Sequence, residues 1–418
     1  MILTASNMKL FRPISLTNCS FKIFSKVLTL RLGKVCTRLV ASNQSAFIKG
    51  RYILESVEVA HEVVHSVHSS QQAGVVLKLD YEKAYDWVSW DFLFEILRTW
   101  NFSPTWIGWM ELLVKKGSVG VNLNREESSF FNPGKGLRQG DPISPLLFNL
   151  VVDVLTRMLT KAANQGLVKG VLTDFTPNGI MSLQYADDTL IFSSNDMGHL
   201  RYLKCCLGLF EQISGMRINF HKSELVVLNL EDEEAHTISH LFGCPLGSLP
   251  MRYLGVPLHF DKLTREDVQP LVDKILKKLA SWRGRLLSSA ARVTLIKTYL
   301  ASIPVYLLSF IKFPKCALHL LNTHMANCLW DDTNDKHKYH LVNWETVSMC
   351  KEFGGLGIPN LWDLNICLLS SWLKRYQVDD DKLWKNLIDY KYRTKEPNIF
   401  HSNTQGASNF FKRCAVGS

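Results

Sequence analysis

Apolar residues recur with two different periods along the first part of the chain. Where they lie three and four positions apart they predict helices, because that spacing gathers them on one helical face. One such helix follows the turn at Arg12–Pro13 and has apolar residues at Phe24, Val27, Leu28 and Leu32, and a second covers residues 53–68.

Strand patterns alternate with further helices up to about residue 262. An apolar run from Val75 to Leu79, opened by Gly74, predicts a buried strand. The other predicted elements are a helix over 90–100 ended by Ser103–Pro104, a hairpin over 120–133, a Gly-rich turn leading into a long helix over 134–162, a hairpin at 184–192, a helix over 199–215 and strands with a turn over 217–230.

From residue 264 the pattern becomes helical and basic. Thr264 and Asp267 have the spacing of a capping box at the start of the first helix there. Mixed strands and helices, followed by helices alone, predict an α+β fold with an all-α unit after it.

The composition is that of a globular protein with excess positive charge. Apolar residues make up 46% of the 418 positions. The length predicts about two to four structural units. The formal net charge is +10, from 48 Lys and Arg against 38 Asp and Glu. This excess fits a polyanionic partner and fits equally a basic, solvated surface.

Neither the cysteines nor the apolar runs indicate export or membrane insertion. The ten cysteines are scattered without a CxxC pair, which predicts reduced thiols in a reducing compartment. The N-terminus lacks the apolar core of a secretory signal. The longest apolar run, residues 298–311, is interrupted by Pro304 and is too short for a bilayer core of about 30 Å, so we expect a buried helix and no membrane.

Acidic residues stand at two places where the pattern predicts strand ends. Asp80 follows the buried run, and Asp187 and Asp188 interrupt the apolar hairpin QYADDTLIF. Each acid alone fits a turn or a helix cap. If both strand systems belong to one sheet, the three carboxylates converge, and clustered oxygen ligands select Mg²⁺ or Mn²⁺. Two such ions catalyse in-line phosphoryl transfer.

Several blocks of sequence resemble the reverse transcriptases of non-LTR (LINE-type) retrotransposons, especially those of plants. The blocks are RPISLTNCSFKIFSKVL, NQSAFIKGR, LKLDYEKAYDWVSWDFL, GLRQGDPISPLLFNLVVDVL and YADDTLIF, followed by GMRINFHKSEL, YLGVPL, GRLLSSAARVTLIKTYLASIPVY and VNWETVSMCKEFGGLGIPNL. Their order and spacing match the family over nearly the whole chain.

The resemblance implies an RNA-directed DNA polymerase with the right-hand fold of fingers, palm and thumb, an antiparallel palm sheet and a helical C-terminal extension. It assigns residues 1–262 to interleaved fingers and palm, 263–320 to a helical thumb and 321–418 to a helical tail. The implied partners are an RNA template, a DNA primer and deoxynucleoside triphosphates, and the implied location is the nucleus. It does not predict an oligomeric state.

The resemblance also implies roles for individual residues. Asp80, Asp187 and Asp188 would bind two Mg²⁺ or Mn²⁺ ions. Lys222 would protonate the departing pyrophosphate. Tyr85 would lie under the incoming sugar and select deoxynucleotides by clashing with a 2′-hydroxyl. The residues expected to bind the nucleotide or the nascent base pair are Arg12, Tyr85, Arg138, Gln139 and Gly140.

A further set is expected to contact template and primer. Lys49 and Arg51 would contact the template backbone, and the turn at Tyr253, Leu254 and Gly255 would grip the primer. The full set is Lys49, Arg51, Tyr253, Leu254, Gly255, Lys277, Lys278 and Arg283. A core aromatic, a solvated loop arginine and a surface lysine are the ordinary structural alternatives for Tyr85, Arg138 and Lys222.

Some features depart from the family's pattern. Leu10 stands where many relatives have an acid, and Trp87 stands where a basic residue is common. Relatives extend upstream through further fingers residues and an endonuclease domain, and downstream through a Cys/His zinc module. We therefore expect a fragment of a longer element, with incomplete fingers.

Three alternatives remain on the sequence alone. HEVVH at residues 61–65 fits the zinc-protease pattern HExxH, but it lacks a suitable third ligand and lies in an ordinary amphipathic helix. A catalytically decayed, nucleic-acid-binding remnant of the same element would keep the basic residues of the thumb. An intron-maturase-like splicing factor would share the scaffold, but EFGGLGIPNL resembles the plant element instead.

Overall fold

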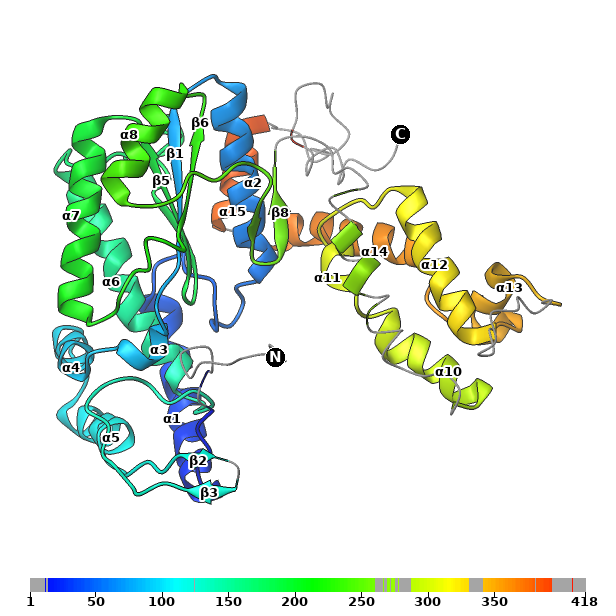
Figure 1. Ribbon diagram of the computed structural model, residues 1–418, viewed down its shortest axis with the longest axis horizontal. Coiled ribbons are helices and arrows are strands. Elements are labelled where there is room, and N and C mark those ends of the chain that lie inside the picture. Colours follow the sequence, from blue (N-terminus) through cyan, green and yellow to red (C-terminus); the bar gives the residue numbers. More distant parts are fainter. Residues whose placement is uncertain are drawn as a thin grey trace. The chain divides into compact units, whose positions relative to one another are not determined.

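The computed structural model describes residues 12, 14–123, 125–259, 266, 269–270, 272–274, 277, 287–330, 341–379, 381–392 and 408. The chain divides into two compact units, residues 1–258 and residues 259–418 (Figure 1). The sequence predicted the change from mixed structure to helices at about residue 262, and this domain assignment stays a prediction. The predicted capping box at Thr264 and Asp267 lies outside the described residues.

An antiparallel sheet forms the centre of the first unit. Its strands are β1 (Gly74–Leu79), β4 (Ser182–Tyr185), β5 (Asp188–Ser194) and β6 (Glu224–Leu228), in the order β4-β5-β1-β6. Every pairing is antiparallel. The prediction of an α+β fold with an antiparallel sheet is confirmed, and the apolar run after Gly74 is an inner strand.

Helices cover both faces of this sheet, with α2 on one side and α7 on the other (Figure 1). The helices of the first unit are α1 (Cys19–Leu39), α2 (Ile53–Ser69), α3 (Ala84–Trp87), α4 (Trp90–Thr99), α5 (Pro104–Val114), α6 (Ser144–Asn164), α7 (Met197–Ser214) and α8 (Asp232–Phe242). The long helix α6 is a deeply buried part of the core, since Leu147, Phe148, Leu150 and Val151 are all inaccessible to solvent.

Local sequence signals set most of the helix boundaries. Asn18 begins α1 by accepting a hydrogen bond from the Phe21 N–H at 2.9 Å. Gly215 ends α7 with φ of 74°, a left-handed conformation that glycine adopts without strain.

The prediction for Pro104 is wrong in one respect. The helix that begins at Trp90 already ends at Thr99, and Pro104 opens α5 instead of closing its predecessor. Ser103 caps α5 by accepting from the Trp106 N–H at 3.2 Å. Proline is favoured at the first helical position because its missing N–H has no partner there in any case.

Two short hairpins complete the first unit. The predicted hairpin over 120–133 contains β2 (Asn122–Leu123) and β3 (Glu126–Glu127). The second hairpin pairs β7 (Met251–Tyr253) with β8 (Val256–Leu258).

The described part of the second unit is helical and has its own core. Its elements are α10 (Ser289–Leu295), η3 (Ile296–Leu300), α11 (Val305–Leu308), α12 (Lys315–Trp330), α13 (Trp344–Ser348), η4 (Lys351–Phe353), α14 (Leu361–Val378) and α15 (Leu383–Tyr392). Phe310, Trp372 and Trp384 pack edge to face in the core. Residue 320, the predicted end of the thumb, lies inside α12, and the division into thumb and tail stays a prediction.

Candidate functional site

Strand register brings the three predicted carboxylates to one end of the sheet. β1 and β5 are antiparallel, and the last paired residues are Leu79 and Thr189. The next position on each strand is Asp80 on one side and Asp188 on the other, so the pairing places these two opposite each other. Asp187 lies in the turn between β4 and β5, directly before Asp188. The predicted convergence of the two strand systems is therefore found.

Electrostatics confirm that the three carboxylates act on one another. Removal from water raises the pKa of Asp80, and the charge of Asp187 raises it further. Desolvation also raises the pKa of Asp188, with additional contributions from Asp187 and Asp80. The surfaces of Asp80 and Asp188 remain partly open to solvent. Asp80 and Asp188 are therefore accessible to a ligand, and a bound cation would reduce the repulsion between the carboxylates.

Three cationic side chains partly offset this repulsion. Lys222 and Lys78 lower the pKa of Asp80, as does Arg12 to a smaller extent. Lys78 also lies 3.9 Å from Glu224 on the neighbouring strand. Lys222 and Arg12 were predicted site residues, and both act on the carboxylates. The sequence analysis missed Lys78. Its position two residues before Asp80 in LKLD puts both side chains on the same face of the strand.

The turn that carries Asp187 is held by a buried glutamine. Ala186 has φ of 54°, in the left-handed region that favours glycine. Its N–H donates to Oε1 of Gln44 at 3.1 Å, and the same oxygen accepts from the Ala46 N–H at 3.0 Å. Gln44 is completely buried. It belongs to the block NQSAFIKGR, but only the structure identifies it as the residue that positions the acidic turn.

The backbone of Asp80 is fixed from the other side by the segment that contains Lys222. The Asp80 N–H donates to Oγ of Ser223 at 3.0 Å, and the Asp80 carbonyl accepts from the Asn219 N–H at 2.7 Å. These two bonds place NFHKSEL against the end of β1. Lys222 is consequently near Asp80, and its charge lowers the pKa of that carboxyl.

Tyr85 lies beside the acids on a rigid support. Its ring stacks on Phe148 of α6, with 4.5 Å between ring centroids and 8° between planes. Burial raises the pKa of its hydroxyl, and the charge of Asp187 adds to the effect. The ring is half-buried, so one part packs in the core and another faces the site.

The loop that contains Gln139 and Gly140 packs close to Tyr85 and the N-terminal segment. The Leu137 N–H donates to the Tyr85 carbonyl at 2.7 Å, and the Gln139 carbonyl accepts from the Ser15 N–H at 2.8 Å. Nε2 of Gln139 donates to Asp86 at 3.0 Å. Gly140 has φ of 102°, and a Cβ there would lie 3.2 Å from the Ser15 carbonyl oxygen.

Two predicted binding residues, Arg138 for the nucleotide or template and Arg51 for the template backbone, also bond within the protein. The Arg138 guanidinium donates to the carbonyls of Leu113 and Lys116, the latter at 2.9 Å, where α5 ends. The Arg51 guanidinium donates to the carbonyls of residues at the end of α1 and in the loop after it, namely Val40, Ala41 and Gln44. Both arginines donate to carbonyl groups at or just after helix ends, which helices leave without a partner. These guanidinium groups therefore bind within the fold.

The remaining predicted contacts are distributed over both units. Lys49 is exposed beside the buried residues of its block. Leu254 and Gly255, with φ of 48° and 83°, form the turn of the β7–β8 hairpin, and Tyr253 is buried before it. Lys277 belongs to the second unit, and its neighbours in the prediction, Lys278 and Arg283, lie outside the described residues.

The donor set fits a divalent cation by its chemistry. Asp80, Asp187 and Asp188 offer only hard carboxylate oxygens, which suit Mg²⁺ or Mn²⁺. As their side chains stand, no three His, Cys, Asp or Glu residues in the described ranges form a group that could hold a metal ion. The fit therefore rests on ligand type, shared charge and strand register.

The zinc-protease alternative finds no open surface in α2. His61 is 7% exposed and Glu62 is fully buried, so neither faces a substrate.

None of the helices in the described ranges combines the length and apolar character that a membrane crossing requires.

Comparison with known proteins identifies the family. Residues 4–258 match the family described as reverse transcriptase (RNA-dependent DNA polymerase). The Transposon TX1 uncharacterized 149 kDa protein of Xenopus laevis is 24% identical over 393 residues, which are 92% of this chain and 29% of that protein.

Two further relatives come from a plant and an insect. An Arabidopsis thaliana protein whose name assigns it to the ribonucleases H is 30% identical over 141 residues, 34% of this chain and 23% of that protein. The retrovirus-related Pol polyprotein from the type-2 retrotransposable element R2DM of Drosophila melanogaster is 25% identical over 380 residues, 86% of this chain and 33% of that protein. The chain spans 33% or less of each of these relatives. Because the family match covers more than half of its length and includes every one of the clustered carboxylates, the chain belongs to the reverse transcriptase family.

Proposed function

We propose that this chain adds deoxynucleotides to the 3′-end of a DNA primer, directed by an RNA template. The observation that carries the proposal is the meeting of Asp80, Asp187 and Asp188 at one end of a family-typical sheet. The partners are accordingly an RNA template, a DNA primer and deoxynucleoside triphosphates. We further propose a plant non-LTR (LINE-type) retrotransposon as the source and the nucleus as the place of action.

The carboxylates would form the catalytic centre. Asp80, Asp187 and Asp188 would hold two divalent ions, which when bound activate the primer hydroxyl and neutralise charge on the leaving pyrophosphate. The strand register fixes Asp80 and Asp188 relative to each other before substrate arrives. Such preorganisation keeps the reacting groups in line at little entropic cost.

The neighbouring side chains would bind and select the nucleotide. Arg12 and Lys222 carry positive charge close to the acids, where the triphosphate must lie. Lys222 would donate a proton to the departing pyrophosphate as a general acid. Tyr85, supported by Phe148, would exclude a 2′-hydroxyl, and Gly140 would let the backbone approach the nascent base pair.

The residues expected to contact template and primer receive two kinds of proposed role. Lys49 is exposed and remains a proposed contact to the template backbone. Arg51 and Arg138 are proposed to shape the surface from within, because each already donates to several carbonyls. Tyr253, Leu254 and Gly255 stay proposed as the turn at the primer strand, and Lys277, Lys278 and Arg283 as thumb contacts.

Primer extension tests the catalytic role directly. Purified protein is incubated with poly(rA)/oligo(dT), dTTP and Mg²⁺, with and without a chelator. Wild-type protein should extend the primer only without chelator, and Asp187→Ala should abolish extension while retaining template binding and cooperative unfolding. Asp174→Ala, a change at an exposed loop acid, is the matched control.

The outcomes separate the proposal from its main rival. Extension by Asp187→Ala at the wild-type rate would defeat the assignment of the acids. Template binding without extension by the wild-type protein would favour a decayed, nucleic-acid-binding remnant. Tyr85→Val should admit ribonucleotides, and an unchanged sugar preference would remove Tyr85 from that role.

A further inference from the structure

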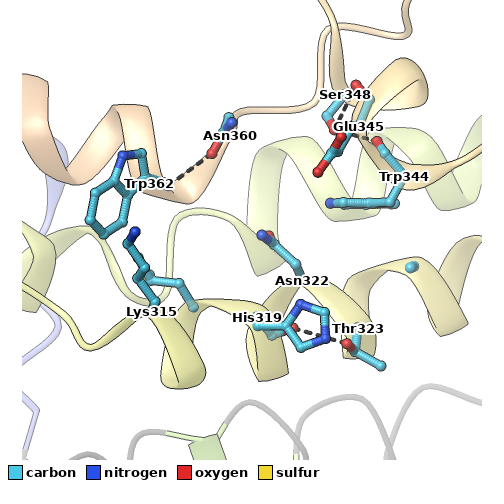
Figure 2. A pocket seen from close by; sticks show the side chains of 11 residues that line it. Lys315, His319, Asn322, Thr323, Trp344, Glu345, Ser348, Asn360 and Trp362 are labelled. Atoms are coloured by element: carbon cyan, nitrogen blue, oxygen red, sulfur yellow. Dashed lines mark hydrogen bonds between the residues drawn. The ribbon is translucent and has the colours of Figure 1, made fainter.

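A cavity in the second unit takes no part in the proposed polymerase reaction. It has a volume of about 560 Å³ and lies among α12, α13 and the N-terminus of α14 (Figure 2). The residues that line it include Lys315, Asn322, Trp344, Glu345 and Trp362. We call it the tail pocket. Its volume lies within the range of about 300–1,000 Å³ that is common for ligand sites.

Two tryptophans give the tail pocket flat apolar surfaces. Trp344 and Trp362 are each half-buried, so part of each ring remains accessible. Trp330 meets Trp344 edge to face, with 5.8 Å between ring centroids. The Trp362 N–H donates to Oδ1 of Asn360 at 2.9 Å, which fixes the start of α14 (Figure 2). The edge-to-face contact therefore supports the indole of Trp344, and the bond from the Trp362 backbone fixes the position of that residue in the first turn of α14.

Asn322 supplies an acceptor that the protein itself does not use. Figure 2 shows its side chain rising from α12 toward the space between Trp362 and Trp344. Its Oδ1 is buried and has no hydrogen-bond partner. Buried acceptors in native proteins are nearly always paired, so an unpaired one that faces a cavity indicates a missing donor.

Charge gives the tail pocket two different ends. The Lys315 ammonium lies 5.3 Å from the ring centroid of Trp362. Glu345 lines the opposite part of the cavity, beside Trp344 (Figure 2). An anionic group is favoured at the lysine end, whereas the glutamate end favours a second hydrogen-bond donor and repels phosphate.

We propose that the tail pocket binds an unpaired, amino-bearing nucleobase of single-stranded nucleic acid. The base stacks on an indole, its amino group donates to Oδ1 of Asn322, and its phosphate approaches Lys315. Base–indole stacking of this kind is common where proteins bind single strands. A duplex would present no free base face for stacking on an indole. The proposal does not depend on catalysis at Asp80.

Oligonucleotides that differ at one edge of the base test the assignment. Cytosine carries an amino group where uracil carries a carbonyl. Fluorescence anisotropy with labelled oligo(C) and oligo(U), at one fixed salt concentration, should show tighter binding of oligo(C) by the wild-type chain. Asn322→Leu should remove this preference, because leucine cannot accept the bond. Asn386→Leu, the same change at an exposed site on α15, should keep it.

Stacking and charge are tested separately. Trp362→Ala should weaken binding of both oligonucleotides about tenfold, and Trp362→Phe should restore most of it. Lys315→Glu changes an exposed side chain and should weaken both without disturbing the fold. Thermal unfolding of each variant establishes that it is folded.

The results also separate this proposal from the polymerase proposal. If the folded variants Trp362→Ala, Asn322→Leu and Lys315→Glu bind both oligonucleotides with wild-type affinity, the proposal that the tail pocket binds a nucleobase is wrong. A peptide would then be the occupant to test. Asp187→Ala should keep the preference for oligo(C). Failure of primer extension by the wild-type chain would contradict the proposed function without altering the expected binding results.

Discussion

Single residues at the acidic site act against folding. For Asp80 and Asp188 the pKa in the folded chain is raised, first by desolvation and then by neighbouring acids. An acid with a raised folded pKa binds its proton more tightly in the folded state, so stability falls as pH rises through the window between its unfolded and folded pKa. The unfolded value for aspartate is about 3.9.

Removing one of these charges should therefore stabilise the chelated protein. Asp188→Asn is expected to raise the melting temperature at neutral pH, and its advantage should vanish below a pH of about 4, where the carboxyl is protonated in both states. Asp174→Asn should change little at either pH. Calorimetry from a pH of about 3 to a pH of about 7 checks this, and a lower melting temperature of Asp188→Asn at neutral pH would contradict it.

Trp87 shows how a departure from the family pattern is accommodated. Its ring has the Lys135 ammonium 3.5 Å from the centroid and the Arg217 guanidinium 4.0 Å from it. A ring face attracts cations, whereas the basic residue common at this position in relatives would repel both. The aromatic residue is therefore consistent with its two basic neighbours.

Restoring a basic residue at this position should destabilise the protein. Trp87→Arg loses two cation–π contacts and places three cations together, at a cost of about 1–2 kcal/mol. The loss should shrink in high salt, because screening weakens the repulsion. Trp87→Phe keeps a ring and is the control. Denaturant unfolding at low and high salt measures the difference, and equal stability of the two variants would refute the explanation.

At the scale of elements, the position of Arg51 is explained by the unpaired carbonyls at a helix end. Arg51 donates to the Ala41 and Gln44 carbonyls at 2.5 Å each and to the Val40 carbonyl at 2.9 Å. It thereby joins the end of α1 to the loop before α2. Lys49, two residues earlier, is exposed.

A matched pair of substitutions separates these two roles. Arg51→Met should lower the free energy of unfolding by about 2–3 kcal/mol, because buried carbonyls lose charged donors. Lys49→Met should leave stability within about 0.5 kcal/mol and reduce the salt dependence of template binding. Urea unfolding and anisotropy titrations test both variants. A stable Arg51→Met that has lost template binding would reverse the assignment.

The sequence predicted elements and acids better than it predicted side-chain partners. Strand periodicity placed Asp80 and Asp187–Asp188 at strand ends because alternation is a local rule, whereas their convergence was expected only if the two strands share a sheet. The reverse transcriptase fold expected from the motifs is confirmed by the family match. The bonds of Arg138 to the end of α5 and of Gln44 to Ala186 join distant segments, and no local pattern encodes them. Pro104 was misread because proline both ends and begins helices.

At the scale of the whole molecule, each compact unit has a core of its own. Trp372, 1% exposed, lies in the core of the second unit and donates from Nε1 to the Ser309 carbonyl at 2.9 Å. Phe210, fully buried, belongs to the core of the first unit. Separate cores predict separable unfolding transitions.

Core substitutions should therefore act on one transition each. Trp372→Ala is expected to destabilise the second unit by about 3–5 kcal/mol and to leave the transition of the first unit in place. Phe210→Ala should do the converse. Differential scanning calorimetry resolves the two, with Mg²⁺ expected to shift only the transition that Phe210→Ala affects. A single transition lowered equally by both variants would show one cooperative unit.

The register between β1 and β5 has a consequence for how such a gene decays. Asp80 and Asp188 meet only because Leu79 pairs with Thr189. Gain or loss of one codon within Gly74–Leu79 would turn every following side chain to the opposite face. Point mutations that keep the length of this strand would leave the pairing register, and therefore the acids, in place. In diverging copies of the gene, we expect in-frame insertions and deletions in this short segment to abolish the proposed activity sooner than substitutions do.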